Sequence, residues 1–562
     1  MLRKIRLTLA ILFFALITLL FLDFTGSVHA LFGWMARIQF LPALLAVNVG
    51  VVLFWVLLTL LFGRVYCSVI CPLGVMQDVI AWFSKRKKKN RYSYSPAKSW
   101  LRYGVLVLFV VALIAGIGSV VALLAPYSAY GRIAQNLFAP IWACGNNILA
   151  YLAERMNSYA FYETEVWVRS LPTFIVAGAT LLILVVLAWR SGRTYCNTIC
   201  PVGTVLGLLS RFSLFRPVID LNKCNGCKLC SRRCKASCIN ADAHQIDYSR
   251  CVVCMDCIDV CRQGAISYQY RFKRSETAPA ADHETVAPQA ADRADSVSAT
   301  VSTSTSTSAS TGTTSSTCAP FVHESGAAPL SSESNVVTCT ASGISTMNPL
   351  SDTGKMRRHF LTGLGLWLGA VAVKAQEKKV DGGLAVILDK KIPERLTPIV
   401  PPGARGLHHL TAHCTGCQLC VAVCPNGVLR PSTDPMRLMQ PEMSYERGYC
   451  RPECTKCSEV CPAGAILPIT PAEKSAIQIG HAVWVKENCL PVTDGVACGN
   501  CARHCPAGAI RMVPLDSNRE GSPKIPIVNE ERCIGCGACE DLCPARPFSA
   551  IYVEGHKRHR MI

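Results

Sequence analysis

The sequence predicts a membrane α-helical protein, with a four-span bundle and a fifth signal-anchor helix, that also contains two small α+β modules rich in cysteine. Composition predicts the membrane part: the 562 residues are 51 % hydrophobic and only 17 % charged, with a mean hydropathy of +0.30, which is too apolar for a soluble chain. The cysteines predict the modules. Sixteen of the 32 lie between Cys414 and Cys543, in regular short spacings that a secreted disulfide domain would not show.

Four apolar stretches predict the spans: residues 7–22, 42–62, 103–125 and 171–189. A hydrocarbon core needs ~20 residues, so only the first stretch is slightly short. Lysine and arginine gather before the first stretch, after the fourth, and most densely over residues 85–91. By the positive-inside rule, the N-terminus and the chain after the fourth stretch face the cytoplasm. The net charge of +20 therefore indicates topology, and no nucleic-acid binding is expected.

The membrane domain, residues 1–215, contains one motif twice. Residues 63–74 and 192–203 both read G-R-x-Y-C-x-x-I-C-P-x-G, which indicates a pseudo-two-fold repeat. Cysteines four apart share a helix face. The pairs Cys67/Cys71 and Cys196/Cys200 could therefore supply four thiolates to a metal or cluster, or they could be small packing residues. No C-x-x-C-H occurs in the chain, which excludes a c-type haem.

Residues 216–271 contain two cysteine quartets in the spacing of a bacterial two-cluster ferredoxin. In that spacing three cysteines wrap one [4Fe–4S] cube and the fourth reaches the neighbouring cube. We therefore expect one cluster on Cys224, Cys227, Cys230 and Cys261, and the other on Cys251, Cys254, Cys257 and Cys234. No proline follows Cys234, and Cys238 is an alternative fourth ligand. Zinc is disfavoured because it needs two C-x-x-C pairs.

Residues 272–355 predict a disordered linker, because fifteen of the 18 residues from 300 to 317 are Ser or Thr. Residues 356–376 then resemble a twin-arginine export signal: Arg357 and Arg358 precede a short apolar run that ends at Lys374. A signal in mid-chain predicts a fusion of two proteins, the alternative being a fifth structural helix with a chance arginine pair. An export signal at this position would place residues 377–562 in the periplasm.

Residues 377–562 contain four further quartets, which predict four [4Fe–4S] clusters rather than disulfides or zinc. A proline follows each last cysteine and should end the short helix there. The four quartets are Cys414, Cys417, Cys420 and Cys424; Cys450, Cys454, Cys457 and Cys461; Cys489, Cys498, Cys501 and Cys505; and Cys533, Cys536, Cys539 and Cys543.

The membrane half, with its paired C-x-x-x-C-P motifs and two-cluster module, resembles the NapH-type membrane ferredoxins of periplasmic nitrate reduction. The twin-arginine signal and four-cluster module resemble the NapG-type periplasmic ferredoxins. The resemblance implies a quinol dehydrogenase of the bacterial inner membrane, with residues 216–355 cytoplasmic. It would take electrons from the membrane quinone pool, ubiquinol or menaquinol, and pass them through six [4Fe–4S] clusters to periplasmic nitrate reductase and its cytochromes. The twin-arginine export machinery would be a further partner.

The resemblance also implies which quartets exchange their last cysteines: the first with the fourth, and the second with the third. The implied sets are Cys414, Cys417, Cys420 with Cys543; Cys533, Cys536, Cys539 with Cys424; Cys450, Cys454, Cys457 with Cys505; and Cys489, Cys498, Cys501 with Cys461.

We expect the quinol site among the spans, with Arg64, Tyr66, Arg193 and Tyr195 as candidate contacts. One alternative is a ferredoxin pair of methylamine-type oxidation. Another is an assembly or docking factor for a periplasmic molybdoenzyme that does not turn over. Two clusters inside and four outside would be separated by ~30 Å of hydrocarbon, and only the C-x-x-x-C-P thiols could hold a carrier between them.

Overall fold

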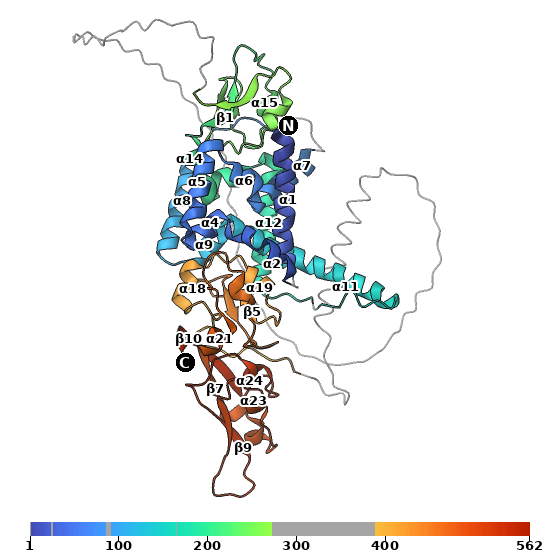
Figure 1. Cartoon of the computed structure of the whole chain (residues 1–562), viewed down its shortest axis with the longest axis vertical. Helices are drawn as coiled ribbons and strands as arrows, with labels where there is room; N and C mark the ends of the chain where they lie inside the picture. The colour runs from blue at the N-terminus through green and yellow to red at the C-terminus, as the bar shows by residue number, and fades with distance from the viewer. Residues whose placement is uncertain (1, 24–25, 86–91, 165, 273–387) are drawn as a thin grey trace, which may run out of the picture. The chain divides into compact units, whose positions relative to one another are not determined.

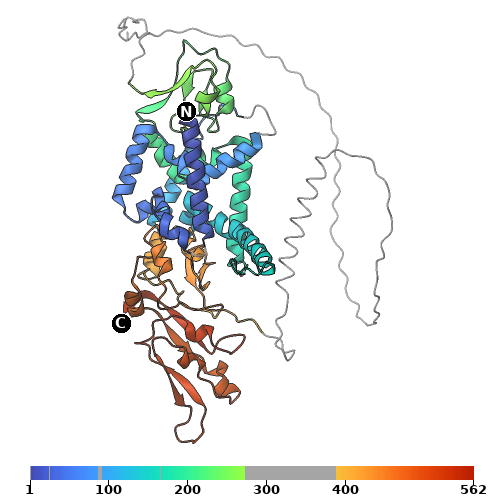
Figure 2. The ribbon, with the colours of Figure 1, turned by 45° about the vertical axis from the view of Figure 1, so that its right-hand side comes forward.

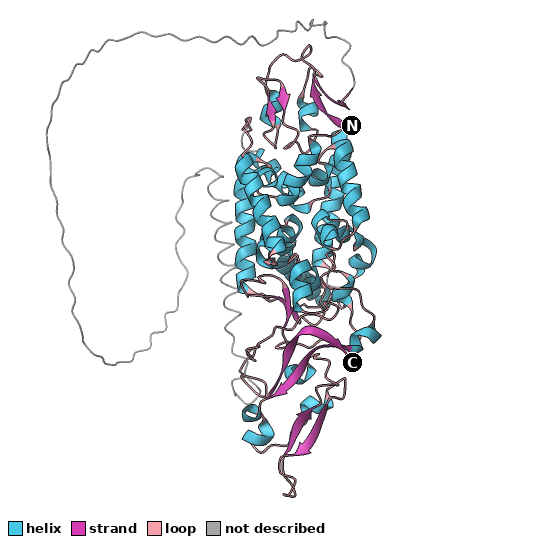
Figure 3. Cartoon of the chain, turned by 90° about the vertical axis from the view of Figure 1, so that its left-hand side faces the viewer, coloured by secondary structure: helices cyan, strands magenta, loops and turns pink. Residues whose placement is uncertain are grey.

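The computed structural model describes residues 2–23, 26–85, 92–164, 166–272 and 388–562 (Figure 1). The expected linker and the signal-like helix lie outside the described residues. Helices form most of the region before residue 211, and the strands lie in the two cysteine-rich modules that follow (Figures 1 and 3).

Two helices in the described part of the chain are long and apolar enough to cross a membrane, α1 (Leu2–Leu22) and α12 (Leu171–Ser191). Each has 21 residues and is therefore ~30 Å long. They can be followed through the helical domain in Figures 1 and 2.

The other two expected spans are each broken in two, so a bundle of four continuous spans is not confirmed. The second is α4 (Phe40–Leu45) followed by α5 (Val49–Phe62), and the third is α8 (Ser99–Ile114) followed by α9 (Gly118–Leu124). The breaks are alike. In each, a left-handed residue, Val47 or Gly116, interrupts the helix, and a backbone N–H bonds to the carbonyl five residues earlier over 2.9 Å.

The two copies of the repeated motif fold in the same way. A long helix ends at a left-handed glycine, Gly63 (φ 76°) or Gly192 (φ 68°), where a side chain would be strained. A one-turn helix follows, α6 (Val65–Val69) or α13 (Thr194–Thr198). The next helix then starts at a proline, α7 (Pro72–Lys85) or α14 (Pro201–Ser210), because proline fits the first helical position.

All eight residues of helix α10 (Pro126–Ile133) are buried. This helix continues into a π-helix, η1 (Ala134–Phe138), and then into α11 (Ala139–Arg155), of which no residue is fully buried. Short helices α2 (Ser27–Phe32) and α3 (Trp34–Arg37) follow α1. The buried core of this domain includes Cys417 and Leu419 of the second module.

The first module has the repeated pattern of a two-cluster ferredoxin. Its outer strands β1 (Phe215–Ile219) and β4 (Ile266–Tyr270) pair antiparallel, with Phe215 opposite Tyr270. A short hairpin of β2 (Ile239–Asn240) and β3 (Gln245–Ile246) separates its two quartets. Helices α15 (Leu229–Arg233) and α16 (Asp256–Val260) each contain the third cysteine of a quartet.

The second module repeats this pattern twice. A hairpin of β5 (Leu429–Pro431) and β6 (Pro441–Met443) lies between quartets one and two, and a hairpin of β8 (Ile510–Pro514) and β9 (Lys524–Val528) lies between quartets three and four. Strand β7 (Ile477–Trp484) joins the halves and pairs with the last strand, β10 (Ile551–Met561). The short helices of this module are α18 (Leu407–His413), α19 (Leu419–Ala422), α20 (Lys456–Glu459), α21 (Pro471–Ala476), η2 (Lys486–Asn488), α22 (Leu490–Thr493), α23 (Asn500–Arg503) and α24 (Ala538–Asp541).

The two modules contact opposite ends of α1. At its start, Arg3 Nε bonds to Asp256 Oδ1 of the first module over 2.9 Å. At its end, Phe21 and the backbone of Cys417 in the second module both lie against Gly131 of α10. The length of α1 therefore separates the two contacts.

Candidate metal centres

The first module brings its quartets together around two small cavities. One is lined by Cys224, Cys227, Cys230 and Cys261, and the other by Cys251, Cys254, Cys257, Cys234 and Cys238. The chain turns sharply between these cysteines through left-handed residues such as Gly226, Lys228 and Met255. These are the two groupings expected from the spacing. That they hold clusters stays a prediction.

Cys234 and Cys238 both face the second of these cavities. Their sulfur atoms are 3.5 Å apart, and Cys238 is only 1 % exposed. The structure therefore leaves both thiols available as the fourth ligand of this quartet.

The second module does not group its cysteines in the way that the expected exchange predicts, so that prediction is wrong. Cys450, Cys454 and Cys457 share a cavity with Cys424 rather than Cys505. Cys533, Cys536 and Cys539 share one with Cys505 rather than Cys424. Cys461 interacts electrostatically with Cys414, Cys417 and Cys420, and Cys543 with Cys489 and Cys501.

The hairpins explain this pairing. A hairpin between two quartets turns the chain back at once, so the next quartet in sequence lies beside the previous one after a short loop closure. Quartets one and two therefore exchange their last cysteines, as do three and four, and the first module follows the same rule.

The lining of these cavities suits a cube. Within the described ranges, no three His, Cys, Asp or Glu side chains stand close enough to hold a single metal ion. In a [4Fe–4S] cluster each cysteine binds a different iron, so four ligands surround the cube instead of meeting at one point. The lining of each cavity by four or more thiols and by apolar residues such as Ile266 and Val553 fits that arrangement.

The four thiols of the repeated motif lie together inside the helical domain. Cys67, Cys71, Cys196 and Cys200 are each 4–5 % exposed. Cys200 interacts electrostatically with the other three. The structure thus unites the two pairs that lie 129 residues apart in the sequence, 67 to 196.

Each copy of the motif is held by the arginine of the other copy. Arg64 donates to the Cys196 carbonyl over 3.1 Å and to Asn197 Oδ1 over 2.9 Å. Arg193 donates to the Cys67 carbonyl and forms an ion pair with Asp78 over 2.9 Å. This reciprocal bonding makes the repeat a pseudo-two-fold around the thiols.

Two glycines make the reciprocal bonding possible. A methyl group on Gly203 would clash with the Cys196 carbonyl and stand 2.8 Å from the Arg64 guanidinium, and one on Gly74 would clash with the Cys67 carbonyl and stand 2.9 Å from that of Arg193. The last glycine of each motif copy therefore leaves room for the arginine side chain of the other copy.

The expected quinol contacts are engaged within this repeat. Arg64 and Arg193 are 0 % exposed. The Tyr66 hydroxyl donates to Gln39 Oε1 over 2.9 Å, and Tyr195 is buried beside Cys196 and Cys200. A headgroup at Arg64, Tyr66 or Arg193 would have to displace bonds of this repeat, and quinol contact at the four residues stays a prediction.

A line of buried groups connects the thiols with both modules. On one side, Arg64 is 3.8 Å from Cys67 Sγ and interacts electrostatically with Cys251 of the first module. On the other, Arg132 of α10 interacts with Tyr195 and with Cys417 of the second module. No expectation was drawn for Arg132 from the sequence, although the run Pro126–Ile133, with two tyrosines and an arginine, is more polar than the long apolar helices of this domain.

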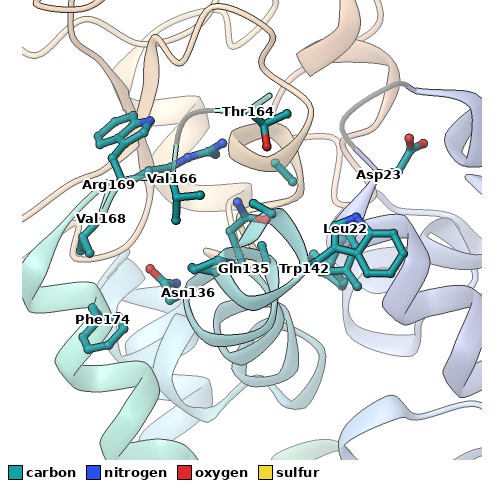
Figure 4. Close-up of a pocket in the computed structure, with 16 residues that line it drawn as sticks. Leu22, Asp23, Gln135, Asn136, Trp142, Thr164, Val166, Val168, Arg169 and Phe174 are labelled. Carbon is teal, nitrogen blue, oxygen red and sulfur yellow. The ribbon is translucent and has the colours of Figure 1, made fainter. Parts of the chain in front are cut away.

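A larger cavity of about 150 Å³ opens where α1 ends, α12 begins and α11 starts (Figure 4). Arg169, just before α12, lines it and donates to the Val421 carbonyl of the second module. Asn136 also lines it and donates to Gln418 Oε1 over 2.9 Å. The sequence held no motif that would have identified this cavity.

Comparison with protein families gives three matches. A "4Fe-4S binding domain" profile matches residues 44–91 and 173–220, each containing one copy of the repeated motif. A "4Fe-4S dicluster domain" profile matches residues 413–465 and 496–546, which agrees with the pairing of quartets one with two and three with four. Another "4Fe-4S binding domain" matches residues 244–267.

Several curated proteins are similar to parts of the chain. The methylamine utilization ferredoxin-type protein MauM of Methylophilus methylotrophus is 34 % identical over 163 residues, 28 % of this chain and 71 % of that protein. The ferredoxin-type protein NapH of Haemophilus influenzae is 28 % identical over 234 residues, 40 % of this chain and 68 % of that protein. The ferredoxin-type protein NapF of Escherichia coli is 28 % identical over 179 residues, 32 % of this chain and 99 % of that protein. No solved structure matches.

Proposed function

The chain belongs to the family of ferredoxin-type proteins that includes MauM, and from this we propose that it is a membrane-bound quinol dehydrogenase. It would pass electrons from quinol to a periplasmic nitrate reductase system, as the resemblance to the NapH-type and NapG-type ferredoxins implies, and its similarity to the ferredoxin-type proteins NapH and NapF supports this. Residues 216–271 would face the cytoplasm and residues 377–562 the periplasm of a bacterial inner membrane. The chain would join a membrane and a periplasmic ferredoxin through residues 272–376.

One observation carries the proposal. Cys417 and Leu419, from the first quartet of the second module, belong to the same buried core as α1 and α10 of the helical domain. A cluster bound there would lie against the membrane domain, where a lipid-soluble donor can reach it. Clusters supply one-electron transfer at potentials that the protein sets by burial and by hydrogen bonds to sulfur.

Six clusters on 24 cysteines follow from the quartets. The proposed sets are Cys224, Cys227, Cys230, Cys261; Cys251, Cys254, Cys257 with Cys234 or Cys238; Cys414, Cys417, Cys420, Cys461; Cys424, Cys450, Cys454, Cys457; Cys489, Cys498, Cys501, Cys543; and Cys505, Cys533, Cys536, Cys539. We propose that Cys67, Cys71, Cys196 and Cys200 hold one more redox cluster between the two modules, which agrees with the description of the family profile that matches both motif copies.

A methylamine-type system is the second candidate for the reaction partner, because MauM is the relative with the higher identity to this chain. To separate the two candidates, the purified protein is mixed with periplasmic nitrate reductase or with a methylamine-oxidising enzyme. The oxidation state of the clusters is then followed optically with each partner.

Reduction of the purified full chain by a quinol analogue tests the dehydrogenase role. We expect EPR signals of reduced [4Fe–4S] clusters to grow after the analogue is added anaerobically. Dithionite reduction of the same sample is the control that shows intact clusters. If dithionite reduces the clusters and the quinol analogue reduces none, the dehydrogenase role is wrong and a docking or assembly role takes its place.

A further inference from the structure

The cavity where α1 ends and α12 begins has the character of a ligand site. Its volume is about 150 Å³ and its lining is mostly apolar, with Phe21, Leu22, Trp142 and Phe174 around it. Four polar or charged side chains, Asp23, Gln135, Asn136 and Arg169, are among the remaining lining residues (Figure 4). An apolar pocket with a few convergent polar groups is typical of sites for small organic molecules.

We propose that this cavity binds the headgroup of a quinol, an inference that rests on the proposed function and gives that function its binding site. The structure offers a matching acceptor. Gln135 Oε1 is buried and has no hydrogen-bond partner among the residues that the structure describes, and a buried polar atom without a partner is costly. A quinol hydroxyl is a donor that would satisfy it. Gln135 lies on the π-helix η1, an element that often marks functional sites.

Arg169 gives the other side of the cavity its donors. Its guanidinium has five N–H groups and donates to the Val421 carbonyl. Other N–H groups on the same plane can bond to the second oxygen of the headgroup. The planar ring would then be held between the Gln135 acceptor and the Arg169 donor, and these two contacts would fix one orientation of the quinol.

The cavity adjoins the cysteines of the second module. Ala422 belongs to its lining and lies between Cys420 and Cys424 in the sequence. Arg169 interacts electrostatically with both of these thiols. A headgroup in the cavity would therefore be next to the cysteine sets of the first and second quartets, to which single electrons must leave.

The lipid side of the cavity is open to an isoprenoid tail. Trp142 of the lining is 49 % exposed, and Ile141 beside it on α11 is 60 % exposed. Since α11 has no fully buried residue, its apolar side chains suit the membrane interface. A quinol could enter from the bilayer with its tail along this helix.

The reaction at the site balances as follows. Oxidation of one quinol to the quinone breaks two O–H bonds and releases two protons and two electrons. The electrons leave one at a time to the [4Fe–4S] acceptors of the proposed function. The protons leave to water on the side of the second module, past the Asp23 carboxylate in the lining.

A photoreactive azidoquinol, kept reduced under anaerobic conditions, tests the site in the purified full chain. We expect the label in peptides that contain residues 135–143 and 166–174. Gln135→Leu should weaken retention of the azidoquinol about five- to tenfold, because the variant removes one hydrogen bond from a quinol hydroxyl to a buried acceptor. Ala139→Leu, which fills the cavity wall, should abolish the labelling, and Ala150→Leu, the same change on α11 outside the lining, should leave it unchanged.

The outcomes separate the site from the function. Label that appears elsewhere, for example beside Arg64 or Tyr195, or label that survives Ala139→Leu, overturns the proposed cavity while quinol reduction of the clusters stands. No specific label anywhere, together with clusters that quinol does not reduce, overturns both. Specific label in the expected peptides, lost in Ala139→Leu but not in Ala150→Leu, supports the site.

Discussion

At the scale of single residues, the repeated motif is defined by what its small and charged members do for the cysteines. Arg64 and Arg193 each hold the backbone of the other copy's first cysteine, and Gly74 and Gly203 leave the space for those guanidinium groups. The motif is therefore a mutual clamp on four thiols. A packing role for the thiols alone gives no reason for a buried arginine with at least two hydrogen-bond partners in each copy.

Gly203→Ala should destabilise the chain by about 1–3 kcal/mol, the usual cost of adding a methyl group to a filled site. The methyl would clash with the Cys196 carbonyl and crowd the Arg64 guanidinium. Gly178→Ala on α12 is the control, because nothing lies within 4 Å of its added methyl and alanine favours a helix. Thermal unfolding of the detergent-solubilised variants measures both. Equal melting temperatures would contradict the clamp.

His559 on β10 should make the stability of the second module sensitive to acid. Burial, aided by nearby His556, lowers the pKa of His559 to about 4, while the unfolded chain keeps a value near ~6.5. The unfolded state therefore binds the proton more tightly, so this contribution is complete above pH ~6.5 and is lost as the pH falls toward 4.

His559→Gln should remove part of that pH dependence. We expect the wild type to lose more stability than the variant between pH 6.5 and pH 5, measured as melting temperatures of the two proteins in the same buffers. Parallel curves for the two proteins would show that His559 does not titrate between the folded and unfolded states.

At the scale of elements, the hairpin between two quartets decides which cysteines share a cluster. Paired substitutions test this grouping. Two cysteines replaced in the same set should remove one cluster, whereas two cysteines replaced in different sets should remove two clusters. Cys424→Ser with Cys450→Ser should lower the iron content by ~4 per chain, and Cys424→Ser with Cys533→Ser by ~8. Iron and acid-labile sulfide assays measure this.

The reverse result, with the larger loss in the Cys424/Cys450 pair, would restore the exchange of quartet one with quartet four. Cys144→Ser serves as the control, because Cys144 lies on α11 outside every quartet and its loss should leave the iron content unchanged.

Spacing alone predicted the cysteine groups of the first module, because its two quartets have only one way to exchange ligands. Four quartets allow several exchanges, and the choice depends on hairpins whose strands, such as β5 with three residues, are too short to stand out in sequence. The helical breaks were missed for a similar reason. A hydropathy window averages over Val47 and Gly116, whose left-handed backbone ends a helix without changing how apolar the stretch is.

The large cavity could not be predicted, because its lining is drawn from α1, η1, α11, the segment before α12 and the second module. Gln135 and Arg169 lie in no recognisable sequence motif. Their role becomes visible only because the fold brings them into the same cavity lining as Ala422. By contrast the four thiols of the repeat could be predicted as a set, since duplication of the motif already implies that the two copies face each other.

At the scale of the whole molecule, the proposed cluster on the four thiols would complete a route between modules that contact opposite ends of a ~30 Å helix. Cys251 lies near Arg64, Arg64 near Cys67, and on the far side Tyr195 and Arg132 lead to Cys417. No other cysteine of the described helical domain is buried. If electrons cross between the modules within one chain, these thiols are where a carrier can be held.

Membrane-impermeant dithionite, added to inverted vesicles, tests this route without using quinol. In the proposed topology it meets the first module, and the second module inside the vesicle receives electrons only through the chain. Wild-type protein and Cys144→Ser should show reduced EPR signals from both modules. Cys67→Ser with Cys196→Ser should show prompt signals from the two first-module clusters alone, because the step between the modules loses two of its four thiolates. Prompt reduction of every cluster in that variant would mean that electrons pass between the modules by another path, and the mutual clamp of the two arginines would then serve stability only.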